Sequence, residues 1–146
     1  MRVLQFAFDG KSDNPHLPRN YTPNTVVYTG THDNPTTREW YDELPNAQRR
    51  TLWRHLKRPT GKDLEVASAL INLAWSSAAA LAIAPLQDVL NLGTEARMNV
   101  SGRAEGNWRW RCTEDMLMTS AFQWLCDLTK TSKRASFESH TLVDRR

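Results

Sequence analysis

Cysteine is scarce in this sequence, and long apolar runs are absent. The two cysteines, Cys112 and Cys126, are far apart and belong to no CxxC or Cys/His cluster, so we expect neither a disulfide framework nor a metal site. Unpaired thiols fit a reducing cytoplasm best. No window approaches the roughly 18 consecutive apolar residues of a membrane span, and the amino end lacks the regions of a signal peptide. These absences argue against a secreted, metal-binding or membrane protein.

A strong charge of one sign is lacking as well. The 19 Lys and Arg residues against 16 Asp and Glu residues give a formal net charge of +3, and much of this excess lies in the C-terminal tail. Such a balance is too weak to indicate a nucleic-acid partner. Hydrophobic residues make up 40% and charged residues 24% of the 146 positions, as in an ordinary folded domain.

Short apolar runs alternate with amphipathic segments along the chain. We expect strands at Arg2–Phe8, Thr25–Thr31 and Leu81–Leu86. We expect helices at Thr37–Glu43 and Ala47–Lys57, from an N-cap at Asp63 to about Ala78, and from a cap at Thr113 to Leu128. This alternation predicts parallel βαβ units and an α/β fold. Residues 1–131 form the folded segment, and the polar, aperiodic residues 132–146 are expected to be a disordered tail.

The amino end begins inside an apparent buried strand. Met1 is followed at once by the apolar residues Val3, Leu4 and Phe6. Natural domains usually begin with a surface segment, so we expect the chain to be truncated.

Polar residues follow each predicted strand, where active sites of parallel α/β folds lie. They are Asp9–Asn14, His32–Asn34 and Gln87–Asp88. The middle group places a carboxylate beside hydrogen-bonding side chains. Such a group can hold sugar hydroxyls and oppose the positive charge of an oxocarbenium-like transition state. The plainer alternative is that His32 and Asp33 cap the following helix or tie down the loop.

Several longer motifs give this pattern a family resemblance. The strings VLQFAF, DNPHLPRNY, YTGTHDN, APLQDVLNLGTEARMN and GNWRWR, in this order, resemble the C-terminal part of 4-alpha-glucanotransferases of glycoside hydrolase family 77. The resemblance covers about residues 1–130. It implies a (β/α)8 barrel of which this chain holds about the last three βα units, because a complete barrel needs about 250 residues.

The resemblance also implies residue roles. Asp33 matches the family's third catalytic carboxylate, a transition-state stabiliser, and His32 matches a histidine that contacts the donor sugar. The family uses a retaining double displacement that transfers α-1,4-glucan segments between maltooligosaccharides, with no cofactor. Its nucleophile and acid/base lie on earlier strands, so this chain alone should be inactive and should need the N-terminal part of the barrel. The remaining predicted substrate-binding residues are Asn34, Gln87, Asp88, Asn99 and Trp108.

Some of these residues have a plainer alternative role. Asp88 either faces the sugar cleft or closes a strand through hydrogen bonds to the backbone. Asn99, with Glu95 and Arg97, either belongs to a substrate loop or lies in a loop held by an ion pair between Arg97 and a carboxylate, which we favour. Trp108 either stacks on glucose or anchors a loop.

The WRWR string around Trp108 and Trp110 could also stack on nucleic-acid bases. The low net charge makes this a weak alternative. His16, His55 and His140 show no ligand spacing and receive no role.

Two positions depart from the family pattern. Pro35 stands where many members have an acidic residue after HDN, and Ser101 replaces a usual proline in the motif ARMN-x-PG. Proline would stiffen the loop and remove a backbone donor, and Ser101 would loosen the next loop. A competing function is therefore a non-catalytic remnant that binds glucan or complements another barrel fragment.

Overall fold

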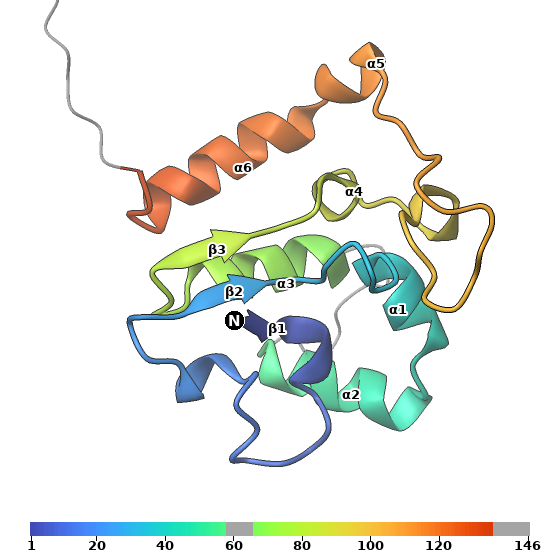
Figure 1. Ribbon diagram of the computed structural model, residues 1–146. Helices are drawn as coiled ribbons and strands as arrows, with labels where there is room; N and C mark the ends of the chain where they lie inside the picture. The colour runs from blue at the N-terminus through green and yellow to red at the C-terminus, as the bar shows by residue number, and fades with distance from the viewer. Residues whose placement is uncertain (58–65, 136–146) are drawn as a thin grey trace, which may run out of the picture.

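The fold is built on a three-stranded parallel sheet. The computed structural model describes residues 1–57 and 66–135. The strands are β1 (Arg2–Val3), β2 (Val26–Tyr28) and β3 (Leu81–Ile83), in the order β1-β2-β3 (Figure 1). Both neighbouring pairs are parallel, which confirms the expected parallel arrangement. Within the described ranges, no helix is long and apolar enough to cross a membrane.

The strands are shorter than the apolar runs suggested. After Val3 the chain forms a 3-10 turn, η1 (Leu4–Phe6), in which the Ala7 N–H donates to the Leu4 carbonyl (2.9 Å), while the Gln5 N–H still donates to the Thr29 carbonyl (3.3 Å). The third strand ends at Ile83 because Pro85 is the N-cap of a new helix, α4 (Leu86–Val89), which the sequence did not predict. Two further 3-10 turns are η2 (Pro18–Asn20) and η4 (Thr94–Ala96).

The helices follow the predicted periodicity, with corrected ends. Helix α1 spans Thr37–Glu43 as predicted, and α2 spans Asn46–His55, because Lys57 adopts a left-handed φ of 54°. Helix α3 (Val66–Trp75) ends before Ala78. The predicted last helix is divided into α5 (Glu114–Leu117) and α6 (Ser120–Thr131), with Thr119 in an extended conformation between them. Its expected cap, Thr113, makes no capping side-chain bond.

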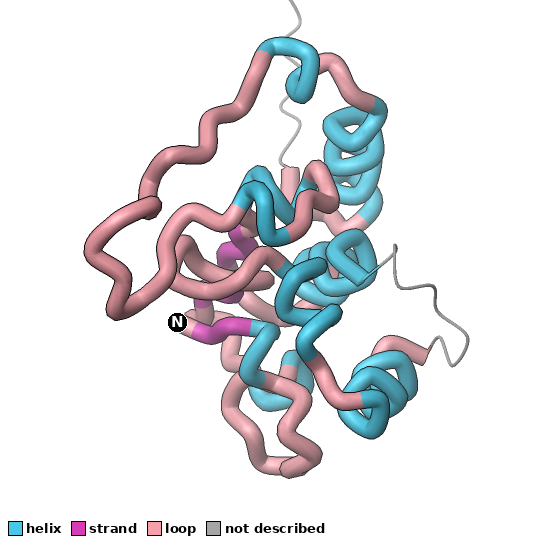
Figure 2. The backbone as a smooth tube through the Cα atoms, turned by 90° about the vertical axis from the view of Figure 1, so that its right-hand side faces the viewer, coloured by secondary structure: helices cyan, strands magenta, loops and turns pink. Residues whose placement is uncertain are grey.

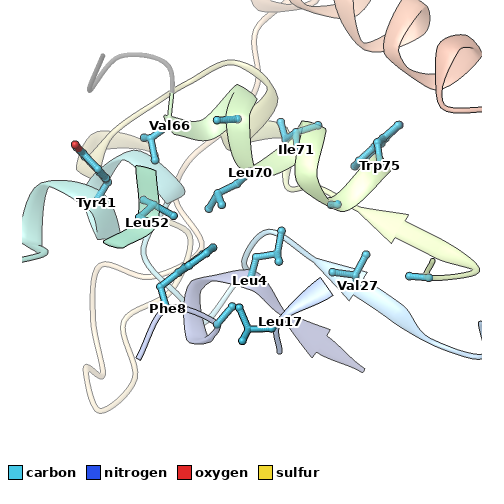
Figure 3. Close-up of a cluster of buried hydrophobic side chains, with 14 of the residues drawn as sticks. Leu4, Phe8, Leu17, Val27, Tyr41, Leu52, Val66, Leu70, Ile71 and Trp75 are labelled. Atoms are coloured by element: carbon cyan, nitrogen blue, oxygen red, sulfur yellow. The ribbon is translucent and has the colours of Figure 1, made fainter. Parts of the chain in front are cut away.

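Helix α3 covers one face of the sheet and forms the core with it. Leu4 and Val27 from the sheet side and Leu70 and Ile71 from α3 are fully buried in one cluster, and Figure 3 shows Leu70 pointing from α3 toward Leu4. Of the apolar positions with helical spacing that predicted this helix, Ala67, Leu70, Ile71, Ala74 and Trp75 are buried, whereas Ala78 is exposed and lies outside α3. Most helical segments lie on one side of the strands, and long loops lie on the other (Figure 2).

The opposite face of the sheet is also apolar but is only partly covered. Side chains alternate along a strand, so Val26 and Tyr28 point away from the face of the buried Val27. The register places Leu81 and Ile83 beside them on β3. All four are partly or largely exposed, and Leu81 reaches 51%.

The end of the described chain returns to α3. Trp75 Nε1 donates to Thr129 Oγ1 of α6 (2.9 Å). Arg134, which was expected to belong to the tail, donates to the carbonyls of Trp75 (2.6 Å), Ser77 (2.8 Å) and Ala79 (2.9 Å). The expected tail residues 136–146, with His140, and the expected cap Asp63 lie outside the described residues.

Candidate active site

A pocket of about 530 Å³ opens at the carboxyl ends of β2 and β3. Six of the seven predicted site residues line it: His32, Asp33, Asn34, Gln87, Asp88 and Trp108. The seventh, Asn99, is hydrogen-bonded to Asp33. The structure thus brings together residues that are up to 76 positions apart in the sequence, from His32 to Trp108.

A tight turn presents His32 and Asp33 to the pocket. The Asn34 side-chain oxygen accepts hydrogen bonds from the Thr31 N–H (3.0 Å) and hydroxyl (2.7 Å), and the Asn34 N–H donates to the Thr31 carbonyl (3.1 Å). The two residues inside this turn therefore project outward, and their side chains are 56% and 54% exposed. His32 Nε2 lies 3.3 Å from Asp33 Oδ2. Asn34 thus shapes the turn that carries both side chains.

Asp33 does not cap the helix that follows it. Thr36 is the N-cap of α1, and its hydroxyl accepts the Glu39 N–H (3.2 Å). Asp33 Oδ1 instead accepts a hydrogen bond from Asn99 Nδ2 at 2.6 Å. The helix-capping alternative is therefore wrong for Asp33, whereas its contact with Asn99 is consistent with the alternative that Asp33 ties down the loop.

Gln5 contacts the loop that carries His32 and Asp33, and the sequence did not predict this contact. Gln5 Nε2 donates to the Pro35 carbonyl (3.0 Å), and a Cβ at Gly30 would lie 2.7 Å from the same nitrogen. A side chain at position 30 would therefore displace the Gln5 amide from this contact. Pro35 still provides the carbonyl that this contact uses. The only signal in the sequence was one amide inside the apolar run RVLQFAF.

The geometry favours the plainer role for Asp88. Its carboxylate is 2% exposed and accepts hydrogen bonds from the Thr37 N–H and hydroxyl (2.7 Å each) and from the Thr29 hydroxyl (2.5 Å). Burial raises the pKa of Asp88, and the bonds from Thr29 and Thr37 oppose this change. Asp88 therefore ties α4 to the start of α1 and the end of β2. Gln87 Nε2 similarly donates to the Ala96 carbonyl (3.3 Å).

An ion pair holds the loop that carries Asn99, as we expected for Arg97. Arg97 Nη1 lies 3.1 Å from Glu39 Oε1, and Arg97 Nε donates to the Asn99 carbonyl (3.1 Å). Glu39 is buried in α1. The sequence indicated a carboxylate partner but could not identify Glu39, because the pair spans 58 positions.

Trp108 lies beside His32 at the pocket. The two ring centroids are 5.1 Å apart, and Trp108 is 52% exposed. Its backbone has a φ of 61°, and its N–H donates to the Met98 carbonyl (2.7 Å). Much of the indole is therefore open to a ligand, whereas the backbone is anchored.

Comparisons with known proteins identify relatives of the whole segment. A family model described as 4-alpha-glucanotransferase matches residues 1–118. The chain is similar to the chloroplastic/amyloplastic 4-alpha-glucanotransferase of Solanum tuberosum, with 49% identity over 111 residues that cover 76% of this chain and 19% of the relative. It is also similar to the Streptococcus pneumoniae 4-alpha-glucanotransferase, with 42% identity over 149 residues, 99% of this chain and 28% of the relative.

A solved structure agrees with these relatives. An amylomaltase from Streptococcus agalactiae in complex with acarbose superposes with a TM-score of 0.86 at 27% identity. The match covers 93% of this chain and 27% of that protein. The chain thus spans between about a fifth and just over a quarter of the length of these relatives.

Proposed function

Because this chain belongs to the 4-alpha-glucanotransferase family, glycoside hydrolase family 77, we propose that it forms the part of a 4-alpha-glucanotransferase active site that carries Asp33. One observation carries the proposal beyond family membership. The Asp33 carboxylate lies at a pocket beyond the parallel strands and is fixed by Asn99, while half of its side chain remains exposed. A fixed carboxylate that a sugar can reach is suited to stabilising an oxocarbenium-like transition state.

The proposed architecture is the last three βα units of a (β/α)8 barrel, formed by residues 1–131. Two features support it. The strands follow one another in sequence order, as barrel strands do. One face of the sheet is covered by α3, and the other is apolar and partly exposed, as expected for side chains that fill a barrel interior.

In the proposed mechanism, another part of the protein supplies the nucleophile and the acid/base of a retaining double displacement. Asp33 opposes the charge that develops on the donor sugar, and an acceptor glucan then replaces water. The proposed substrates are maltooligosaccharides or α-1,4-glucan. His32 and Trp108 are the most exposed candidates for sugar contacts, whereas Gln87, Asp88, Asn99 and Asn34 act mainly by holding the site.

We also propose that the protein is cytoplasmic. It rests on the unpaired cysteines Cys112 and Cys126. Bacterial relatives include that of Streptococcus pneumoniae, whereas plant relatives are named as chloroplastic or amyloplastic.

A chimera tests the catalytic proposal. The whole chain replaces the matching segment of the Streptococcus pneumoniae relative, and formation of glucose and longer glucans from maltotriose is measured. We expect activity in the chimera and none in the isolated chain. Asp33→Asn should lower kcat on the order of 100-fold to 1,000-fold, and the exposed Asp115→Asn should not. Turnover by the isolated chain, or an Asp33→Asn chimera as active as its parent, would contradict the proposal.

A second candidate, a glucan-binding segment without catalysis, is favoured by the exposed indole of Trp108. Such a ring can stack on a sugar face. Calorimetric titration of the isolated chain with acarbose tests this candidate, with Trp108→Ala as the variant. Binding that depends on Trp108, together with an inactive chimera, would favour it over the catalytic role.

A further inference from the structure

We infer that Arg97 is a positioning residue that sets the orientation of the Asp33 carboxylate through Asn99, and that Glu39 holds Arg97 in place for this purpose. The inference rests on the proposed function, because it concerns the same carboxylate. It gives the ion pair between Arg97 and Glu39 a role in orienting Asp33, beyond linking the loop of Arg97 to helix α1.

The first step is the rigidity of Glu39. This residue is 6% exposed and lies in the first turn of α1, where its N–H donates to the capping hydroxyl of Thr36. Thr37, which follows the capping Thr36, donates hydrogen bonds to the buried Asp88 through both its N–H and its hydroxyl. The start of α1 is thus fixed on two sides, and it directly follows the loop that carries Asp33.

The second step is the geometry of Arg97. A guanidinium presents its donors in one rigid plane, so two bonded acceptors fix its orientation. Nη1 contacts Glu39 Oε1 and Nε donates to the Asn99 carbonyl, both at 3.1 Å. The Arg97 side chain is only 20% exposed, which limits competition from water. The backbone of Asn99 is therefore held by a charge-assisted hydrogen bond.

The third step is the contact between Asn99 and Asp33. Asn99 Nδ2 donates to Asp33 Oδ1 at 2.6 Å, and His32 lies at the other carboxylate oxygen. Asp33 is otherwise half-exposed on a turn, where a side chain can change rotamer freely. The amide of Asn99 is thus the contact from another loop that selects one carboxylate orientation. Small displacements of a catalytic group can cost on the order of 100-fold in rate.

The ion pair with Arg97 uses one of the two carboxylate oxygens of Glu39. Among the described residues, the buried Glu39 Oε2 has no hydrogen-bond partner. Removing Arg97 entirely would leave this charge buried and unpaired, which is strongly destabilising. The decisive variant must therefore keep the positive charge.

Arg97→Lys is that variant. Lysine can still neutralise Glu39, but it lacks the planar second donor that holds the Asn99 carbonyl. In the chimera described above, we expect kcat to fall about tenfold or more while KM changes by less than about twofold, with little change in Tm. Arg103→Lys, at an exposed position in the same loop, is the matched control and should leave both constants unchanged.

A measurement on the isolated 146-residue chain separates this inference from the proposed function. In ¹⁵N spectra, the Asn99 side-chain amide should show slow hydrogen exchange in the wild type and fast exchange in both Arg97→Lys and Asp33→Ala. If the chimera is inactive but these exchange rates change as expected, the positioning stands and the catalytic role fails. An active chimera with unchanged kcat in Arg97→Lys, or slow exchange that survives this substitution, would overturn the inference.

Discussion

At the scale of single residues, Asp88 shows how a pocket wall can be built from a structural carboxylate. Its two oxygens accept three hydrogen bonds from Thr29 and Thr37. Asp88→Ala would leave the buried Thr37 N–H without this acceptor, and we expect a loss of about 3 kcal/mol in the free energy of unfolding. Asp88→Asn keeps one oxygen and should cost less. Urea denaturation measures both, with the exposed Asp115→Ala as control. Equal stability of Asp88→Ala and wild type would contradict the structural role.

His16, which sequence reasoning left without a role, caps the outer edge of β1. Its Nδ1 accepts the Val3 N–H at 2.9 Å, so the bond requires an unprotonated Nδ1. Burial lowers the pKa of His16, and the nearby Arg2 and the N-terminal amine add to this effect, whereas Asp9 opposes it. The unfolded chain therefore binds a proton more readily than the folded chain.

This difference predicts a pH dependence of stability. The contribution of His16 should be complete above its unfolded pKa of about 6.5 and should be lost as the pH falls through the lower folded value. His16→Asn keeps an acceptor near the Nδ1 position but does not titrate, so it should lose less stability between pH 7.5 and pH 5. Denaturation at both pH values, with the exposed His55→Asn as control, checks this. An identical pH dependence in His16→Asn and wild type would contradict it.

At the scale of elements, periodicity predicted the helices better than apolar runs predicted the strands. Helix α1 was predicted with its observed bounds because Thr36 and Pro45 mark its ends locally. The strands were overextended because the 3-10 turn Leu4–Phe6 and the start of helix α4 lie inside the apolar runs. A buried apolar run does not reveal where the extended backbone ends.

The same distinction separates the predictable and unpredictable parts of the site. His32, Asp33 and Asn34 could be found from their place after a strand and from the family motifs. Glu39 and Gln5 could not, because each contacts the site across at least 30 positions and looks like an ordinary helix or strand residue in the sequence. Contacts that position a loop depend on tertiary packing, so local pattern gives no signal for them.

Another prediction at this scale concerns the C-terminal end of α3. The last carbonyls of a helix lack intrahelical donors, and Arg134 donates to the carbonyl of Trp75, the last residue of α3, and to the carbonyls of Ser77 and Ala79 in the segment that follows it. Arg134→Ala should therefore lower the free energy of unfolding by about 2–3 kcal/mol, as expected for several bonds to a charged group. The neighbouring Lys133 is exposed, so Lys133→Ala should have little effect. Thermal and urea unfolding measure both variants. Equal losses of stability in Arg134→Ala and Lys133→Ala would contradict a stabilising role of the Arg134 hydrogen bonds.

At the scale of the whole molecule, the sheet is open at its β3 edge and on one face, whereas His16 caps the β1 edge. In the described chain, β1 and β3 are each paired on one side only. Leu81 lies on the outer strand β3 and is 51% exposed. Met1 and Phe6, which are close to β1 in the sequence, are 74% and 52% exposed. Open edges beside apolar side chains favour pairing with other chains.

We therefore expect the isolated chain to self-associate through the β3 edge as its concentration rises. Lysine at an edge strand opposes such pairing, so Leu81→Lys should shift the chain toward monomer in sedimentation velocity. Met118→Lys is the matched control, because Met118 is 88% exposed at the end of α5, outside the sheet. In the chimera, where we propose that barrel strands cover this edge, Leu81→Lys should instead reduce stability. A monomeric wild-type chain at high concentration, or equal effects of the two lysine variants, would contradict the open-edge account. Leu81→Lys is thus expected to favour the monomer in the isolated chain and to destabilise the chimera. A substitution at an ordinary surface position would change neither property, so the two measurements together identify an edge that the rest of the barrel covers.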